Sequence, residues 1–430
     1  MNNSNVEKMG KTRRALILLV LGASWAVSYL VPFLQYTWYA PFKEFIGGTN
    51  MQLGLLITIY GFGNVFGAPI GGWFADHFNY KIIYVISVLL NGVFGLVFLM
   101  HPTFGFGVVI WIGFAFASLF LNYPTHIKII RSLASEEGQG TIFGLNETSI
   151  GIFNIIISSS MMVAFTKFNA GTSGIKAAII TNAVISFVLT ILVIVVLPNP
   201  AKTGELEKMR NAEASKEKAN FFKDFGKIFS QQATWLVALS IFAVYSTMTT
   251  LTYFTPYFTD VLKTGATFSG WVAIARQYGT QILGAPVGGI VTDKRGSSAK
   301  ILIGVYIVSI LGFIWVLNLK PGASMFVLVT LLMVMSFATY MGRGSYYATI
   351  AETGVPRDLT ASTIGVAAAV GFSPDLFQFT LFGFWIDKYG NLAYTYMFIY
   401  GIIVCIIGIL AGLQILRLKK RNRRKMEQTA

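Results

Sequence analysis

Long apolar blocks alternate with short polar segments along almost the whole chain of 430 residues. Typical blocks occupy residues 15–34, 82–100 and 396–416, and each approaches the roughly 20 residues that a helix needs to cross the hydrocarbon core of a bilayer. The blocks lack the two-residue alternation of barrel strands, and backbone groups in lipid are satisfied only by helices or a closed barrel. The pattern therefore predicts membrane-spanning helices.

Twelve spans are predicted, so the expected fold class is an all-α membrane protein of two six-helix pseudo-symmetric bundles. The spans cover residues 14–40, 52–76, 80–100, 104–131, 139–167, 174–197, 233–262, 266–293, 298–319, 322–351, 359–387 and 391–418. The first block is too long for a cleaved signal peptide and counts as a span. The predicted domains are an N-terminal bundle (1–197), a cytoplasmic linker (198–232), a C-terminal bundle (233–418) and a basic cytoplasmic tail (419–430).

The composition and the distribution of charge agree with this interpretation. Hydrophobic residues make up 54% of the chain and charged residues 12%, against roughly 25% charged in an average soluble domain. With a cytoplasmic N-terminus, 25 Lys and Arg residues fall on the inner side and 6 on the outer side, as the positive-inside rule requires. We therefore expect a multi-pass protein of the cell inner (cytoplasmic) membrane with both termini cytoplasmic. The net charge of +15 is then a topology signal, and the tail is expected to face anionic lipid rather than nucleic acid.

One sequence segment occurs twice in closely similar form. The segment GAPIGGWFAD, which starts at Gly67, returns 217 residues later as GAPVGGIVTD, which starts at Gly284. Both copies lie at the predicted cytoplasmic end of the second span of their bundle, which indicates an internal duplication. Parallel repeats of six spans are typical of secondary transporters, in which one half rocks against the other around a central site. The glycines permit a close approach between helices.

With these repeats and the segments that follow them, the chain resembles the major facilitator superfamily along its whole length. That superfamily carries the pattern G-x-x-x-D-R/K-x-G-x-R/K after its second span, with a counterpart after its eighth. The first copy here departs from it, because His77 replaces the usual cation and Asn79 replaces the glycine. The resemblance implies a cytoplasmic charge network that latches one state of the transport cycle. It assigns gating roles to Gly72, Asp76, Lys81, Gly289, Asp293, Lys294 and Gly296.

Two arginines are predicted to lie near the middle of the membrane, Arg276 in span eight and Arg343 in span ten. Such a charge costs about 2.5–3.5 kcal/mol on insertion scales unless it faces protein or water. Paired guanidinium donors suit a carboxylate or a phosphate, which makes both arginines candidates for binding an anionic substrate. The alternative is that they pair with Glu147 in span five or Asp375 in span eleven and hold helices together.

Three titratable residues are candidates for proton coupling. Glu147 and Asp375 are the acids expected within the membrane, where an opening cavity would change their protonation. His126 is the third candidate, because histidine titrates near neutral pH. The three histidines and the single cysteine, Cys405, form no pattern of metal ligands, and no nucleophile–base pair or cofactor loop is evident. We therefore expect no metal, no cofactor and no enzymatic activity.

Several tyrosines complete the candidate substrate site, because a phenol offers both a hydroxyl partner and a flat face. Those expected to line a cavity are Tyr29, Tyr36, Tyr253, Tyr346 and Tyr347. Packing and an interfacial aromatic belt are the alternative interpretation. Together with the arginines, such a lining suits a sugar acid, a sugar phosphate or an aromatic acid.

The favoured hypothesis is a secondary active transporter that moves a small organic anion by alternating access, coupled to protons or to exchange. It resembles the sugar-phosphate and organic-anion branches of the superfamily. The organophosphate exchangers keep paired arginines in spans one and seven, so the arginines in spans eight and ten leave carboxylates at least as favoured as phosphates. The alternatives are proton-driven efflux of amphiphilic or cationic compounds, with Glu147 carrying the binding charge, and a non-transporting membrane sensor. The duplication makes a monomer sufficient.

Overall fold

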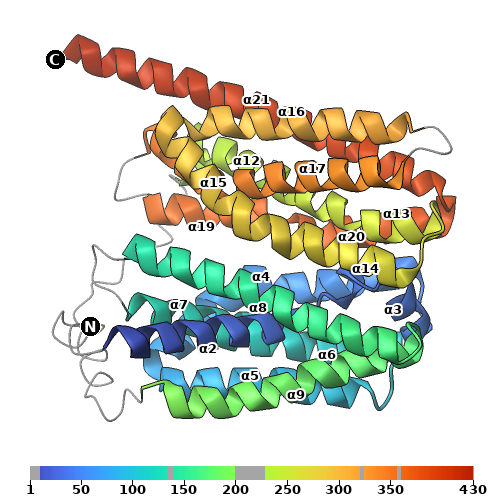
Figure 1. Ribbon diagram of the computed structural model, residues 1–430. Helices are drawn as coiled ribbons and strands as arrows, with labels where there is room; N and C mark the ends of the chain where they lie inside the picture. Colours follow the sequence, from blue (N-terminus) through green and yellow to red (C-terminus); the bar gives the residue numbers. More distant parts are fainter. Residues whose placement is uncertain (1–9, 134–138, 199–227, 320–323, 356–359, 430) are drawn as a thin grey trace. The chain divides into compact units, whose positions relative to one another are not determined.

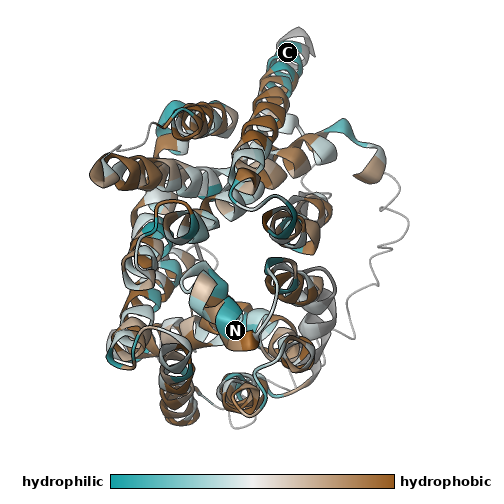
Figure 2. Ribbon diagram, turned by 90° about the vertical axis from the view of Figure 1, so that its right-hand side faces the viewer, coloured by the Kyte–Doolittle hydropathy of each residue, from teal (hydrophilic) through white to brown (hydrophobic). Residues whose placement is uncertain are grey.

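The computed structural model describes residues 10–133, 139–198, 228–319, 324–355 and 360–429, and every regular element in these ranges is a helix (Figure 1). The chain forms two compact units: unit 1 comprises residues 1–217 and 262–274, and unit 2 comprises residues 218–261 and 275–430. Apolar residues dominate the helices of both units (Figure 2). Among the described residues, ten stretches are long and apolar enough to cross a membrane. The all-α membrane fold is therefore confirmed.

Unit 1 contains the helices α2 (Lys11–Leu30), η1 (Leu34–Tyr36), α3 (Tyr39–Ile46), α4 (Asn50–His77), α5 (Tyr80–Phe98), α6 (Phe104–Ala115), η2 (Phe116–Asn122), α7 (Tyr123–Arg131), α8 (Gln139–Lys167), α9 (Thr172–Val196) and α14 (Ala266–Ile274). Unit 2 contains α12 (Gln232–Thr252), α13 (Phe254–Asp260), η5 (Ala275–Gly279), α15 (Thr280–Arg295), α16 (Ser298–Leu317), α17 (Met325–Ser345), η6 (Tyr346–Ala348), α18 (Thr349–Thr353), α19 (Thr360–Gly371), α20 (Pro374–Tyr389) and α21 (Leu392–Thr429). Most of the expected linker, residues 199–227, lies outside the described residues.

Prolines interrupt several spans that the hydropathy pattern predicts as continuous. Span one is wrong at its outer end, because α2 stops at Leu30 rather than near residue 40. Pro32 follows, and a proline has no N–H with which to continue a helix. The carbonyl of Pro32 instead accepts a hydrogen bond of 3.1 Å from the indole of Trp111. Span eleven is likewise divided into α19 and α20, with Pro374 at the start of the second helix.

The duplicated segment, which starts at Gly67 and again at Gly284, has the same packing role in both units. In unit 2, a Cβ atom added to Gly288 would overlap the carbonyl oxygen of Met341 on α17. In unit 1, a Cβ atom on Gly71 would overlap the carbonyl oxygen of Phe120 on η2. Each glycine therefore brings its helix into backbone contact with a neighbouring helix, as small residues do in membrane proteins.

Candidate functional site

The two arginines predicted to bind substrate lie on two elements of unit 2 that pack against each other, η5 and α17. Arg276 belongs to η5, a short π-helical segment, and is 1% exposed. Arg343 lies near the end of α17 and is exposed, with its Nη1 atom 3.9 Å from the sulfur of Met248. Both guanidiniums interact electrostatically with the hydroxyl of Tyr340. π-Helical turns occur frequently at functional sites, and here one carries a buried cation.

A carboxylate and a second phenol belong to the same cluster. The hydroxyl of Tyr245 on α12 donates a hydrogen bond of 2.8 Å to Oδ2 of Asp375. Asp375 is 1% exposed and lies in the first turn of α20, where the helix dipole favours a negative charge. Tyr245 also interacts electrostatically with Arg343 and Tyr346. Two guanidiniums and one carboxylate leave an excess of positive charge among the groups of this cluster.

The remaining predicted tyrosines of unit 2 have different surroundings. Tyr346 is buried and meets the exposed ring of Tyr347 edge-on, with ring centroids 4.5 Å apart. The hydroxyl of Tyr253 donates a 3.0 Å hydrogen bond to the backbone carbonyl of Phe379. That bond ties the junction of α12 and α13 to α20, so for Tyr253 the contacts favour a structural role over substrate binding.

In unit 1 the aromatic residues of α2 gather near a second π-helical segment, η2. Tyr29 stacks on Trp25, with ring centroids 4.6 Å apart, and its hydroxyl donates a 3.1 Å hydrogen bond to the carbonyl of Ser118. Trp25 also contacts the partly exposed ring of Tyr123. Tyr36 lies in η1 and packs against Phe33, whose ring also meets the edge of Tyr60.

His126, a predicted proton-coupling residue, is fully buried in a hydrogen-bonded chain of unit 1. Its Nδ1 atom lies 3.0 Å from the hydroxyl of Tyr84 on α5, and its Nε2 atom lies 3.0 Å from Oδ1 of Asn146 on α8. The edge of the ring meets Trp25. A neutral imidazole satisfies both contacts by donating at one nitrogen and accepting at the other. Glu147, which follows Asn146 on α8, is exposed.

The predicted gating residues at the first repeat are only partly described, because the surroundings of Gly72 and the side chain of Asp76 lie outside the described part of the chain. Lys81 donates through Nζ to the carbonyl of Leu197, at 2.7 Å, just beyond the end of α9. A cation there complements the helix dipole. Asn79, which replaces the motif glycine, has a φ of −64° and caps α5 by accepting a 3.0 Å hydrogen bond from the Lys81 backbone.

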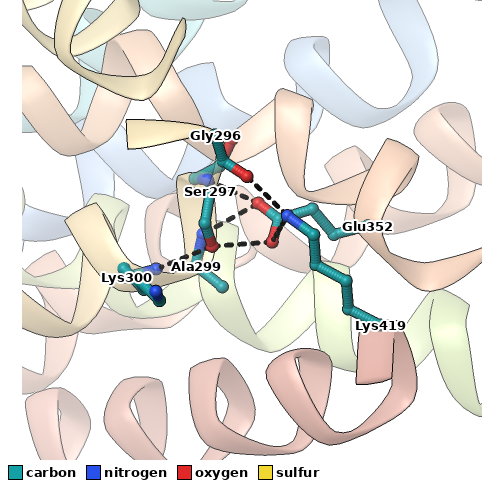
Figure 3. Close-up of polar contacts among 7 residues, drawn as sticks. Gly296, Ser297, Ala299, Lys300, Glu352 and Lys419 are labelled. Carbon is teal, nitrogen blue, oxygen red and sulfur yellow. Dashed lines mark hydrogen bonds and ion pairs between the residues drawn. The ribbon is translucent and has the colours of Figure 1, made fainter. Parts of the chain in front are cut away.

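At the second repeat Gly296 has a φ of +62° at the end of α15, which a glycine adopts without strain. Asp293 and Lys294 are exposed, and nothing lies within 4 Å of a Cβ atom built on Gly289. Among the described residues at this end of unit 2, Lys419 and Glu352 form an ion pair, with 3.2 Å between Nζ and Oε2 (Figure 3). The carboxylate of Glu352 also accepts hydrogen bonds from the backbone N–H groups of Ser298 and Ala299 at the start of α16.

Sequence reasoning missed several residues of these clusters. Tyr340 lies three positions before Arg343, and that spacing on a predicted helix could have identified it as a neighbour. No local signal connects Tyr84 with His126 or Glu352 with Lys419, because these pairs are distant in the sequence.

Known proteins resemble the chain over nearly its whole length. The profile of the Major Facilitator Superfamily matches residues 15–377. The inner membrane protein YihN of Escherichia coli is 26% identical over 405 residues, which cover 94% of each chain. The inner membrane protein YqcE of the same organism is 25% identical over 383 residues, 87% of this chain and 88% of that protein.

Solved structures share the fold at low sequence identity. A bacterial homologue of the human lysosomal transporter Spinster has a TM-score of 0.69 at 14% identity, over 96% of this chain and 98% of the other. The nucleoside transporter NupG has a TM-score of 0.69 at 14% identity, over 95% and 99%. A D-xylose–proton symporter has a TM-score of 0.66 at 16% identity, over 95% and 96%. The chain therefore belongs to the Major Facilitator Superfamily and is a membrane transporter of that superfamily.

Proposed function

We propose that this transporter moves a small organic anion, namely a sugar acid, another carboxylate or a sugar phosphate, across the cytoplasmic membrane by alternating access. The observation that carries the proposal is that Arg276 on η5 and Arg343 on α17, two elements packed against each other, both interact electrostatically with Tyr340. Fold alone does not identify a substrate, so the argument depends on this cluster.

The charges of the cluster favour an anion over a cation. Arg343 is exposed, so its guanidinium can be reached by a solute, and a guanidinium binds a carboxylate or phosphate through two parallel hydrogen bonds. Asp375 is buried, and its Oδ2 atom accepts a hydrogen bond from Tyr245. A cationic substrate that reached this cluster would meet the exposed guanidinium of Arg343 before it met the buried carboxylate of Asp375.

Replacing Arg343 tests the proposal. We expect sugar acids, sugar phosphates or dicarboxylates to raise the melting temperature of the wild type, because specific binding stabilises the folded state by mass action. Arg343→Gln should need an anion concentration at least roughly tenfold higher for the same shift in melting temperature, since a hydrogen bond to a charged group contributes about 1.5–3 kcal/mol. Arg343→Lys should be intermediate, because lysine keeps the charge but loses the planar fork.

The matched control is Lys388→Gln, which removes an exposed cation that lies over the rings of Phe384 and Tyr389, outside the cluster. It should respond to anions like the wild type. If only amphiphilic cations raise the melting temperature, and Arg343→Gln behaves like Lys388→Gln, efflux of cationic compounds becomes the better hypothesis and Glu147 its binding charge.

We further propose that transport is coupled to protons through Asp375, with His126 and Glu147 as the other candidates. A D-xylose–proton symporter among the structural neighbours supports coupling of this kind. In proteoliposomes, Asp375→Asn should abolish accumulation of the bound anion driven by a pH gradient while exchange of internal for external anion continues. Tyr245→Phe removes the hydrogen bond but keeps the carboxyl group, so it should shift the pH profile of uptake and preserve accumulation. Accumulation by Asp375→Asn at the wild-type level would contradict this assignment.

A further inference from the structure

One face of α21 is exposed between Leu392 and Arg424. Its exposed apolar residues follow one another at intervals of three, four or seven positions, which places them on a single stripe. They are Leu392, Ile399, Ile403, Ile406, Leu410 and Leu413. Residues on the opposite side, among them Gly408, Ala411 and Ile415, are buried in unit 2. The stripe is therefore the face that α21 turns toward lipid.

The same stripe continues beyond Leu413, but its residues become cations. Arg417, Lys420, Arg421 and Arg424 are all exposed and extend the spacing of three and four. We call these four residues the basic stripe. No acidic residue occurs between Gln414 and Met426. In Figure 2 the helix that ends at the C label changes from brown to teal near that end, as the apolar stripe gives way to the basic stripe.

The rotation of this helical segment is held by contacts on its other side. Lys419 donates to the carboxylate of Glu352 and to the carbonyl of Gly296 (Figure 3). One turn further on, the side-chain amide of Asn422 donates a 3.0 Å hydrogen bond to the carbonyl of Thr353. These bonds attach the extension of α21 to the ends of α15 and α18. The basic stripe consequently faces away from unit 2.

We propose that the basic stripe binds the headgroups of anionic phospholipids in the leaflet that surrounds this end of α21. Its continuity with the lipid-facing stripe of the same helix identifies the occupant as the membrane. Arg417 lies about 6 Å along the axis from Leu413 at 1.5 Å per residue, within the roughly 5–8 Å of headgroup region on each side of the hydrocarbon core. Arg421 and Arg424 lie further out, and long basic side chains reach back toward the interface. This inference concerns a lipid partner and is independent of the transported solute.

The test uses the full-length protein in nanodiscs made of phosphatidylcholine with increasing fractions of phosphatidylglycerol. We expect enrichment of phosphatidylglycerol around the wild type, measured by native mass spectrometry of retained lipid, and loss of that preference at high salt. Each single variant, Arg417→Gln, Arg421→Gln or Arg424→Gln, should reduce the preference about fivefold, and the triple variant more than a hundredfold. Soluble glycerophosphate should not compete at concentrations that match the lipid headgroups.

Arg423→Gln is the matched control, because Arg423 is an exposed arginine of the same segment on a different face of the helix. It should keep the preference of the wild type. The proposal is overturned if the wild type shows no preference for phosphatidylglycerol, or if Arg423→Gln weakens it as much as Arg421→Gln does. It is also overturned if the basic-stripe variants change only the oligomeric mass, since a second copy of the chain would then be the occupant. If the triple variant does not fold, the three single variants, each compared with Arg423→Gln, decide the question.

Discussion

Gly288→Ala is expected to destabilise the protein by about 3 kcal/mol, whereas the same substitution at the neighbouring Gly289 should be neutral or stabilising. A Cβ atom on Gly288 would overlap the carbonyl oxygen of Met341, and a backbone atom cannot move aside as a flexible side chain can. Overpacking a tight contact costs typically 1–3 kcal/mol and occasionally more, and a backbone obstacle places this case at the upper end. Nothing lies within 4 Å of the Cβ position of Gly289, and alanine is favoured over glycine in a helix by about 1 kcal/mol.

Thermal unfolding of the purified variants in detergent measures this difference. A loss of about 3 kcal/mol corresponds to a fall in melting temperature of roughly 6–12 °C for a unit of this size. Gly71→Ala should behave like Gly288→Ala, because its Cβ atom would overlap the carbonyl oxygen of Phe120. Equal melting temperatures for the Gly288 and Gly289 variants would show that the close approach of α15 and α17 is not needed for stability.

Glu352→Ala is expected to destabilise unit 2 by about 2–3 kcal/mol. The carboxylate is buried and accepts hydrogen bonds from the hydroxyl of Ser297, at 2.7 Å, and from the first two backbone N–H groups of α16. Ser298 and Ala299 are buried, so alanine at position 352 would leave their N–H groups without water to replace the lost acceptor. Unsatisfied buried donors cost about 1–3 kcal/mol each, and the helix N-terminus additionally favours a negative charge.

Two further variants separate the contributions of capping and of the ion pair. Glu352→Gln keeps an acceptor oxygen and should lose about half as much stability as Glu352→Ala. Lys419→Met removes the cation, which is 42% exposed, and pairs near the surface contribute about 0–1 kcal/mol. The melting temperature should therefore be lowered least by Lys419→Met, more by Glu352→Gln and most by Glu352→Ala. A loss for Lys419→Met as large as that for Glu352→Ala would show that the ion pair, rather than the helix cap, is the main contribution.

The candidate site was predicted from sequence less completely than the fold. Arg276, Arg343 and Asp375 stand out because a charge inside an apolar block is expensive, and that cost can be recognised without coordinates. The sequence alone does not decide whether these charges bind substrate or pair with one another. The structure adds Tyr245 as the hydrogen-bond partner of Asp375, and Tyr340 as a buried phenol that interacts electrostatically with both arginines. It also shows that Tyr253 and Lys81 donate hydrogen bonds to backbone carbonyls, which no sequence motif predicts.

By itself the sequence determined the all-α membrane fold and the small residues at which its helices pack. Hydrophobic length and glycine spacing are local properties, and the bilayer acts on each segment separately. Only the tertiary structure decided which polar groups meet, because Tyr245 and Asp375 are 130 positions apart and Glu352 and Lys419 are 67 apart. A buried polar group must find a partner wherever packing places one. Packing is decided by the complementary shapes of whole helices, which no single stretch of sequence contains.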